Sequence, residues 1–183
     1  GTPAQQAYWL PRIADGTYPA AGFCLTESGA GSDPAGMKTR ARRDGDDFVL
    51  DGEKVYITSA EYAGLFVVWA VTDPDAPKGK GISCFLVEAG TPGLSIGKAE
   101  RKLGQHGSAT NTVHFDGCRV PASALMGRLN DGFRVAVGEL AGGRIGVASL
   151  SLGIARAAMD AAKAYVKERR QFGQAIADFQ GIQ

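Results

Sequence analysis

The sequence predicts a mixed α+β protein in which a strand-rich region is followed by a long helix. Between Phe23 and Val120, short runs of β-branched and aromatic residues alternate with glycine and proline, a spacing typical of an antiparallel barrel or sandwich. After Asp131 the apolar period lengthens to that of a helix and continues for many turns. At 183 residues, the chain is long enough for one large domain or two small ones.

Residues 1–21 contain a short helical pattern that carries Trp9 and Leu10 before Pro11, followed by turn residues. We expect this segment to be the end of a preceding helical domain. The next signal is FVL, Asp51-Gly52 and KVYIT. It predicts a hairpin, because Asp-Gly supplies the positive φ angles of tight turns.

Three further strands are expected before the helix. The apolar runs LFVVWAV (65–71) and ISCFLV (82–87) predict largely buried strands. In TNTVHF (110–115) the residue types alternate, so Val113 and Phe115 share one face of the strand.

The long helix after Asp131 carries two adjoining apolar stripes that are rich in alanine. Such a helix is typically buried between neighbours in a bundle. Its partners are absent from the sequence, so we expect the chain to be a segment of a longer polypeptide. Gly173 interrupts the pattern, and a new helix is expected over 175–183. One stripe begins with Phe133, Val137 and Leu140, and the other with Ile145, Ala148 and Leu152.

Composition excludes several classes of function. Lys and Arg number 20 against 19 Asp and Glu, a formal charge of +1, so no global field attracts nucleic acid or an anionic membrane. No uninterrupted apolar run approaches the ~20 residues of a membrane span. The 3 cysteines lack paired spacing, which predicts free, mostly buried thiols in a reducing compartment.

Two polar stretches could bind a ligand. In TESGAGSD (26–33), small residues let the backbone approach a ligand closely and successive N–H groups can form an anion site. For an isolated stretch of this kind a solvated turn is the more frequent structure. In VYITSA (55–60), Tyr56 and Thr58 point to the same face of a strand, as a ring platform beside a hydroxyl. An ordinary sheet face has the same pattern.

Two later stretches complete the set of candidates. KLGQHGSAT (102–110) offers Ser108 and Thr110 in a polar loop, in which His106 is expected to be exposed. ERRQFGQAIADFQ (168–180) places Arg169 and Gln180 on one helical face, unless Gly173 breaks the helix. Arg169 could bind a phosphate, or it could be a surface arginine favoured by the helix dipole.

Motifs of other enzyme classes are missing. The sequence has no Ser-His-Asp ordering, no HExxH, no paired cysteines and no GxGxxG after a strand. Hydrolase, zinc and nicotinamide functions are therefore disfavoured, and no metal site is expected.

Taken together and in this order, the four stretches resemble the acyl-CoA dehydrogenase family. The family's LTEPGAGSD, GxKxWITNG, KLGxRxSxT and ERxxFGxxIxxxQ occur here as LTESGAGSD, GEKVYITSA, KLGQHGSAT and ERRQFGQAIADFQ. The resemblance implies an FAD flavoprotein with an N-terminal helical domain, a central β-barrel and a C-terminal four-helix bundle. The chain would contain the end of the first domain (1–21), the barrel (22–128) and the first part of the bundle (129–183).

The resemblance also implies roles for individual residues. The opening stretch would bind the flavin, and residues of the last stretch would hold the FAD of a neighbouring subunit in an oligomer, expected to be a tetramer. Ser32 would also lie near the acyl thioester, and Ser108 and Arg144 would contact CoA. The expected FAD ligands are Phe23, Leu25, Thr26, Gly31, Ser32, Tyr56, Thr58, Arg169, Phe172 and Gln180.

Family chemistry removes the α-hydrogen of an acyl-CoA as a proton and transfers the β-hydrogen as hydride to flavin N5. The proton needs a carboxylate base, which in most members is a Glu that would lie beyond residue 183. A minority place the base immediately before the arginine that matches Arg144, where this chain has Gly143. Glu139 is a weak candidate, so we expect no catalytic base in this chain and no turnover by it alone.

Several residues depart from the family pattern. Ser28 replaces Pro, Tyr56 replaces Trp, Ser59-Ala60 replaces Asn-Gly, and His106 stands where Arg is common. KGISCFLVEAGTPGLS and GGRIGVASLSLG are most similar to short-chain and branched short-chain members, including the isobutyryl-CoA type.

The resemblance implies a role in fatty acid or branched-chain amino acid catabolism. Electrons would pass to an electron-transfer flavoprotein, in the cytoplasm or, in a eukaryote, the mitochondrial matrix. Alternatives are an oxidase or monooxygenase on the same scaffold, and a non-catalytic binding module that has lost FAD.

Overall fold

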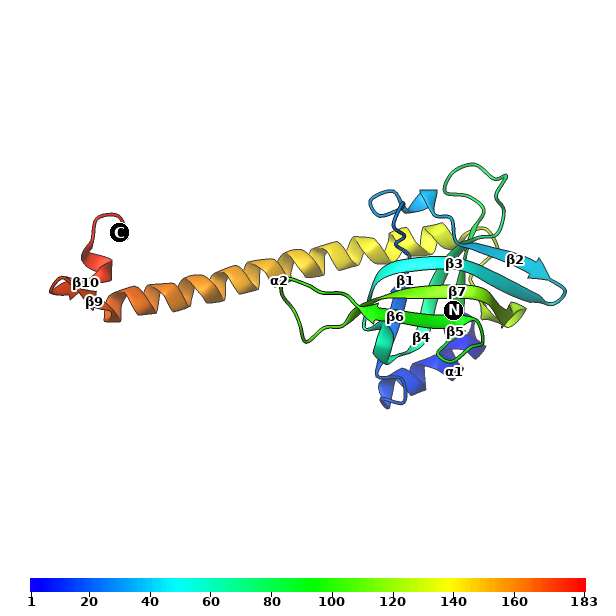
Figure 1. The fold of residues 1–183 in the computed structure, drawn as a ribbon, viewed down its shortest axis with the longest axis horizontal. Coiled ribbons are helices and arrows are strands. Elements are labelled where there is room, and N and C mark those ends of the chain that lie inside the picture. Colours follow the sequence, from blue (N-terminus) through cyan, green and yellow to red (C-terminus); the bar gives the residue numbers. More distant parts are fainter. The chain divides into compact units, whose positions relative to one another are not determined.

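The computed structural model describes all residues from Gly1 to Gln183. They divide into two compact units, Gly1–Val137 and Gly138–Gln183, which are described separately. The first unit holds the sheet and the helix α1 (Pro3–Ala14), and the second holds most of the helix α2 (Gly132–Glu168) (Figure 1). A mixed α+β chain with a strand-rich region followed by a helix is therefore confirmed.

The sheet of the first unit has eight strands. Seven follow the hydrogen-bonded order β6-β7-β3-β2-β4-β5-β8, and β1 pairs with β4 off this path. The strands are β1 (Ala20–Cys24), β2 (Arg40–Asp44), β3 (Asp47–Thr58), β4 (Ala63–Val71), β5 (Ile82–Glu88), β6 (Leu94–Ala99), β7 (Thr110–Pro121) and β8 (Leu125–Met126).

The pairing departs from a closed antiparallel barrel. The end strands β6 and β8 are not paired with each other, so the sheet is open. β1 runs parallel to β4, and β2 meets β4 in parallel at the single pair Arg40 and Val71. The wholly antiparallel arrangement that strand spacing favoured is wrong at these two contacts, because spacing along the chain does not determine which non-adjacent strands pair.

The predicted hairpin at Asp51-Gly52 is also wrong. Both residues lie inside β3, and the turn falls earlier, at Gly45-Asp46 between β2 and β3. Gly45 has φ +64°, which suits a two-residue loop with glycine first. Gly52 has φ +146°, and an added Cβ would lie 2.7 Å from the Thr39 Cα. The absence of a side chain at Gly52 therefore lets the backbone at Thr39 approach closely, at a bulge in β3.

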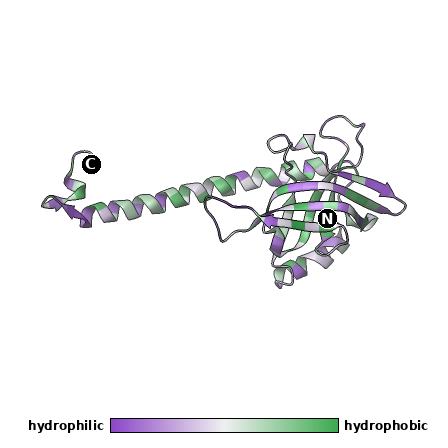
Figure 2. Ribbon diagram, in the orientation of Figure 1, coloured by the Kyte–Doolittle hydropathy of each residue, from purple (hydrophilic) through white to green (hydrophobic).

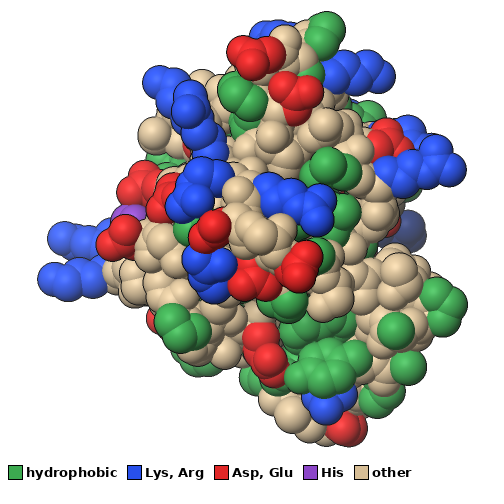
Figure 3. All heavy atoms as spheres, turned by 90° about the vertical axis from the view of Figure 1, so that its right-hand side faces the viewer, with side chains coloured by type: hydrophobic (Ala, Val, Ile, Leu, Met, Phe, Trp, Pro, Cys, Tyr) green, Lys and Arg blue, Asp and Glu red, His purple; other side chains and the backbone are tan.

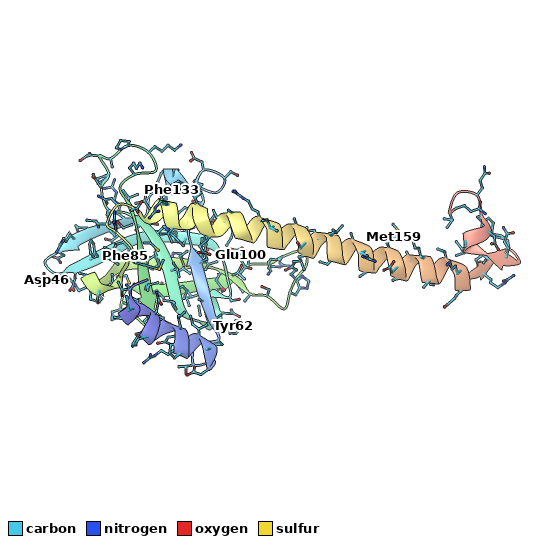
Figure 4. The ribbon with its side chains drawn as sticks, turned by 180° about the vertical axis from the view of Figure 1, so that it is seen from behind. Asp46, Tyr62, Phe85, Glu100, Phe133 and Met159 are labelled. Atoms are coloured by element: carbon cyan, nitrogen blue, oxygen red, sulfur yellow. The ribbon has the colours of Figure 1, made fainter.

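The hydrophobic core of the first unit is formed mainly by buried side chains of the sheet strands. Phe48 and Phe85 are buried with ring centroids 5.0 Å apart, and Figure 4 labels Phe85 within the sheet. Val113 and Phe115 are buried while Thr112 and His114 between and beyond them are partly exposed, which confirms the predicted alternation.

The cysteines behave as expected. Cys24, Cys84 and Cys118 are all free and buried. Burial raises the pKa of Cys24 and Cys84 to about 12 and that of Cys118 to about 11. These thiols are therefore protonated and unreactive near neutral pH.

The helix α1 begins with a capping box formed by Thr2 and Gln5. The Gln5 amide also donates to the backbone oxygens of Ser123 and Leu125, at 2.8 and 2.9 Å, which fastens the helix to the end of the sheet. The helix continues past Pro11 to Ala14, so the short pattern that ended before Pro11 was too short.

The start of α2 is packed against the sheet within the first unit. The Trp69 indole N–H donates to the Gly132 carbonyl at 2.8 Å. A Cβ on Gly132 would lie 2.5 Å from the Cys84 nitrogen, so only glycine allows this approach. Phe133, labelled in Figure 4, follows directly. The onset of the helix is thereby tied to β4 and β5.

The second unit consists of the rest of α2 and a short hairpin. Hydrophobic residues occur along the whole of α2 (Figure 2), and those such as Ile145, Leu152 and Met159 are exposed. The expected helix over 175–183 is wrong: the chain forms β9 (Arg170–Gln171), β10 (Gln174–Ala175) and a short 3-10 helix, Ile176–Asp178. The reason is that the turn at Phe172-Gly173 pairs these two strands.

Charged side chains of both signs are interspersed over the face shown in Figure 3. Ion pairs such as Arg119 with Asp47, at 3.2 Å, join neighbouring strands. This mixed surface agrees with the near-zero net charge and offers no single-sign field on that face.

Candidate functional site

Three of the four singled-out stretches meet at the carboxyl end of β3. The Val55 N–H of β3 donates to the Thr26 carbonyl of the opening loop at 2.9 Å. Three residues further on, Thr58 pairs with Thr110, and the N–H of the next residue, Ser59, donates to the Ala109 carbonyl at 2.8 Å. Stretches far apart in the sequence thus surround the Tyr56–Ser59 segment.

A buried ion pair between Lys54 and Glu27 holds the opening loop, residues 26–33, against β3. Lys54 on β3 is fully buried, and its ammonium lies 2.8 Å from a carboxylate oxygen of Glu27. The same ammonium donates to the Leu25 carbonyl at 3.1 Å and lies 3.7 Å from the Met37 sulfur. All three donors of the lysine are therefore used.

Glu27 extends this anchor to the far side of the loop. One carboxylate oxygen accepts the Lys38 N–H at 2.6 Å, and the other accepts the Thr39 N–H at 3.0 Å. The carboxylate thus joins β3, the opening loop and the segment that leads into β2.

The electrostatics of the pair follow from its burial. Burial opposes ionisation of Glu27, but the hydrogen bond and charge of Lys54, with the donors at Lys38 and Thr39, outweigh it and lower the pKa of Glu27. Burial also lowers the pKa of Lys54, against the opposing effect of Glu27.

A pH-dependent contribution to stability follows. Because the folded-state pKa of Glu27 lies below its ordinary value of 4.5, the interactions of its carboxylate stabilise the fold at pH values above 4.5. This stabilisation is lost as the pH falls through the lowered folded-state pKa.

We expect Glu27→Gln to lower the free energy of unfolding by about 1.5–3 kcal/mol near pH 7. Urea unfolding across a pH series should show the difference from wild type shrinking at acid pH, and a difference independent of pH would contradict this assignment.

The outer surface of the opening loop presents free backbone donors. None of the backbone hydrogen bonds of the chain uses the N–H groups of Ser28, Gly29, Gly31 or Ser32, and all four residues are exposed. Consecutive free N–H groups form a concavity suited to an anion or a carbonyl oxygen.

The loop glycines are not required by the fold itself. Neither Gly29 nor Gly31 has a positive φ, and an added Cβ on either would meet no atom within 4 Å. Glycine at such positions is useful where a ligand approaches the backbone closely.

Tyr56 is held in an unusual conformation at the centre of the site. It has φ +59° and lies at a bulge, where the register with β7 shifts between Lys54 and Ile57. Its side chain is 67% exposed, Thr58 is exposed, and Ile57 between them is buried. A non-glycine residue in this region is strained and is found most often at functional sites.

Phe23 lies exposed at the end of β1, and it rests on a buried aromatic residue. Its ring centroid is 4.4 Å from that of Trp69. Leu25, the next candidate along the chain, is buried, so only its backbone is available to a ligand.

Ser108 lines a cavity of about 580 Å³ beside the end of β3. The Lys102 ammonium donates to the Ser108 carbonyl and to the Thr110 hydroxyl, and thereby folds the loop. His106 is exposed, as expected, and its Nε2 contacts the Lys102 carbonyl at 2.9 Å. Charged and hydroxyl groups of the lining include Glu61, Tyr62, Glu100, Arg101 and Lys102.

The remaining candidates belong to the second unit and are described within it. Arg144 is exposed on α2. Arg169 follows the last residue of α2, and Gln180 lies beyond the hairpin, so the helix is interrupted, as the alternative at Gly173 allowed, and the two residues do not share a helical face. Phe172 occupies the hairpin turn with φ +51° and is 93% exposed.

The residues of the first unit fit a flavin. The free N–H groups of the opening loop suit the pyrophosphate or the polar edge of the ring, and Tyr56 offers an aromatic face. Thr26 and Thr58 add hydroxyl groups to this donor set.

Lys54 and Glu27 are the residues that motif reading missed. Both lie within the singled-out stretches, but neither was proposed for a role. The available signal was their place in the family patterns, because LTEPGAGSD and GxKxWITNG carry a Glu and a Lys at these two positions. A buried lysine also needs a partner.

Comparison with known proteins decides the family. Residues 22–118 match the family model described as "Acyl-CoA dehydrogenase, middle domain", and residues 130–183 match "Acyl-CoA dehydrogenase, C-terminal domain". The chain belongs to the acyl-CoA dehydrogenase family. The resemblance read from the four stretches is thus confirmed, and with it the oxidoreductase class of the family.

Individual members of the acyl-CoA dehydrogenase family match the whole chain. It is 47% identical over 183 residues to the short/branched chain specific acyl-CoA dehydrogenase, mitochondrial, of Bos taurus, covering 42% of that protein. It is 47% identical over 186 residues to the acryloyl-CoA reductase (NADH) of Anaerotignum propionicum, covering 46%.

Among solved structures, butyryl-CoA dehydrogenase from Megasphaera elsdenii matches the whole chain with a TM-score of 0.94 and 42% identity. The chain covers 47% of that structure. It therefore spans less than half the length of each of these three relatives.

One helix of the chain itself, α2, is long and apolar enough to cross a membrane by length and composition. That criterion is weak evidence, because the core helix of a water-soluble bundle also meets it. Most of α2 lies in the segment that matches the C-terminal domain of the family.

Proposed function

We propose that the protein to which this chain belongs is an FAD-dependent dehydrogenase of short or branched short-chain acyl-CoA thioesters. The observation that carries the proposal is the meeting of three family stretches around Tyr56 and Thr58. A ring platform, free N–H donors and a serine-lined cavity are then neighbours on one unit. The similarity to a short/branched chain specific relative supports the substrate class.

The site residues have distinct proposed roles in holding FAD. The backbones of Phe23 and Leu25 and the hydroxyl of Thr26 bind the polar edge of the ring. The loop around Gly31 and Ser32 binds the pyrophosphate through its free N–H groups, which is a suitable donor set for an anion.

The remaining groups of the first unit face the reacting end of the ring and the substrate. Tyr56 covers the ring, and the Thr58 hydroxyl donates beside the nitrogen that takes up hydride. Ser32 also contacts the acyl thioester, and Ser108 contacts the CoA chain. When bound, FAD supplies an acceptor for the two electrons that leave the substrate with its β-hydrogen.

The second unit supplies contacts to a further part of the assembly. We propose that Arg144 binds CoA and that Arg169, Phe172 and Gln180 hold the FAD of a neighbouring subunit in a homo-oligomer, most simply a tetramer. The exposed Phe172 at a strained turn supports this, because its ring is free to bury in a partner.

The same proposal includes the domain boundaries, the catalytic base, the electron acceptor and the cellular location. Residues 1–21, 22–128 and 129–183 would be parts of three domains, with α2 as the first helix of a four-helix bundle that buries its apolar stripes. The base that removes the α-proton would be a Glu outside this chain. Electrons would pass to an electron-transfer flavoprotein in the cytoplasm or, in a eukaryote, the mitochondrial matrix.

Uptake of FAD tests the proposal. We expect the purified protein to bind added FAD, with a change in flavin fluorescence that saturates at one FAD per chain. Thr58→Val removes a hydroxyl from the ring-facing surface and should weaken binding several-fold, by roughly 0.5–1.5 kcal/mol. Thr91→Val, on the segment between β5 and β6, is the matched control and should bind as wild type. A colourless protein that takes up no FAD would contradict the proposal and favour a binding module.

A second reaction on the same scaffold is favoured by one relative. The 47% identical protein of Anaerotignum propionicum is named an acryloyl-CoA reductase (NADH), which makes reduction of an unsaturated acyl-CoA thioester a second candidate reaction. Loss of NADH absorbance on mixing the protein with NADH and an unsaturated short-chain acyl-CoA tests this reaction. Rapid mixing of the reduced protein with air and with an electron-transfer flavoprotein separates a dehydrogenase from an oxidase or monooxygenase. We expect slow reoxidation by air, whereas fast reoxidation by air would indicate an oxidase or monooxygenase.

A further inference from the structure

The buried pair of Lys54 and Glu27 does more than fill the core. Lys54 is fully buried and Glu27 is 8% exposed, yet neither contacts the exposed surface at which a ligand would bind. A buried ion pair contributes little net stability compared with apolar residues of similar size. Its contacts instead reach the backbone on both sides of the opening loop, at Leu25 before it and at Lys38 and Thr39 after it.

The geometry of a peptide unit connects this anchor to the surface. In a trans peptide, the carbonyl of one residue and the N–H of the next point in opposite directions. The Leu25 carbonyl accepts from the buried Lys54 ammonium at 3.1 Å. The N–H of Thr26 in the same peptide unit is therefore directed away from Lys54, and no backbone hydrogen bond of the chain uses it.

The two limbs of the loop are held by the same pair. On the incoming limb, Lys54 binds the Leu25 carbonyl while Val55 binds that of Thr26. On the outgoing side, the Glu27 carboxylate accepts the N–H groups of Lys38 and Thr39. If Lys54 is removed, the Glu27 charge stays buried without its partner, and the Leu25 carbonyl loses its donor.

We propose that Lys54, paired with Glu27, is a positioning residue that holds the opening loop and directs the Thr26 N–H toward the flavin. Lys54 acts through the loop backbone and touches no ligand itself. This inference rests on the proposed function for its ligand, whereas the control of loop geometry is independent of it.

The test separates positioning from stability with two variants. Lys54→Met leaves the Glu27 charge buried and should lower stability. The double variant Lys54→Met with Glu27→Gln leaves no buried charge and should recover much of that stability. Both variants lack the Lys54 ammonium that donates to the Leu25 carbonyl. Lys38→Met, which changes an exposed lysine by the same charge, is the matched control.

Three measurements are made on the purified protein. Amide exchange of residues 26–33 without FAD should be faster in both Lys54 variants than in wild type and in Lys38→Met. FAD affinity should fall by about tenfold or more in the double variant, the loss expected for one misplaced hydrogen bond. The absorption band of bound flavin should also shift.

The results that overturn the proposal are equally defined. Wild-type loop exchange in Lys54→Met would show that the pair does not hold the loop. Wild-type FAD affinity and flavin spectrum in the double variant, with exchange raised, would show that the pair is structural only. Failure of the wild-type protein to take up FAD would overturn the proposed function, and the exchange measurement would still decide whether Lys54 holds the loop.

Discussion

Replacing Gly31 with alanine is expected to weaken FAD binding by about 5- to 150-fold, equivalent to roughly 1–3 kcal/mol of overpacking against a ligand. Within the chain an added Cβ on Gly31 meets no atom within 4 Å, and its φ is not positive. The substitution should leave the free energy of unfolding unchanged, or raise it by about 0.4–1 kcal/mol through the unfolded state. FAD affinity is therefore expected to fall while the free energy of unfolding stays unchanged or rises.

Gly45→Ala is the matched control for this prediction. Gly45 also has open space around an added Cβ, but its φ is +64° and it lies in the β2–β3 turn. Alanine there should lower stability by about 1 kcal/mol through backbone strain and leave FAD affinity unchanged. FAD titration and urea unfolding of the two variants measure both effects. Equal FAD affinity for Gly31→Ala and wild type would show that no ligand approaches this part of the loop.

Replacing Trp69 with alanine is expected to lower the free energy of unfolding by about 3–5 kcal/mol. The indole is 1% exposed, packs against Phe23 and donates to the Gly132 carbonyl. The substitution removes a large buried side chain and leaves that carbonyl without its donor. Since Phe23 rests on this ring, the same variant should also lose FAD affinity.

Trp69→Phe divides the two contributions. It keeps an aromatic ring beneath Phe23 but removes the indole donor, so stability should fall by only about 1–2 kcal/mol. Urea unfolding at fixed pH measures both variants. A loss below about 1 kcal/mol for Trp69→Ala would contradict the packing described here, since such a loss is typical of surface substitutions.

The strands and the long helix were largely predictable, because they depend on residue patterns within single segments. The run at 65–71 became part of β4 and that at 82–87 part of β5, and α2 begins directly after Asp131. The errors arose where distant segments compete for the same backbone. Gly52 was assigned to a turn because it follows Asp51, whereas the approach of Thr39 explains its glycine.

The same division holds for the candidate site. Thr26, Tyr56 and Ser108 were chosen from their residue types and from the order of four family stretches. The family stretch GEKVYITSA contains Lys54, but no role was assigned to it, because a lysine in a strand is usually solvated. Its role became visible when its ammonium was found among Leu25, Glu27 and Met37.

Local sequence was thus sufficient for the class of elements, the family and the segments that carry the site, since hydrophobic periodicity and short motifs are encoded between near neighbours. Strand partners, the open sheet and the buried anchor beneath the opening loop depend on contacts between residues far apart in the chain. Those contacts are selected by packing and by the need to pair every buried polar group. Such a contact also sets the orientation of the Thr26 N–H proposed to bind the flavin, because that orientation depends on Lys54, 28 positions further along the chain.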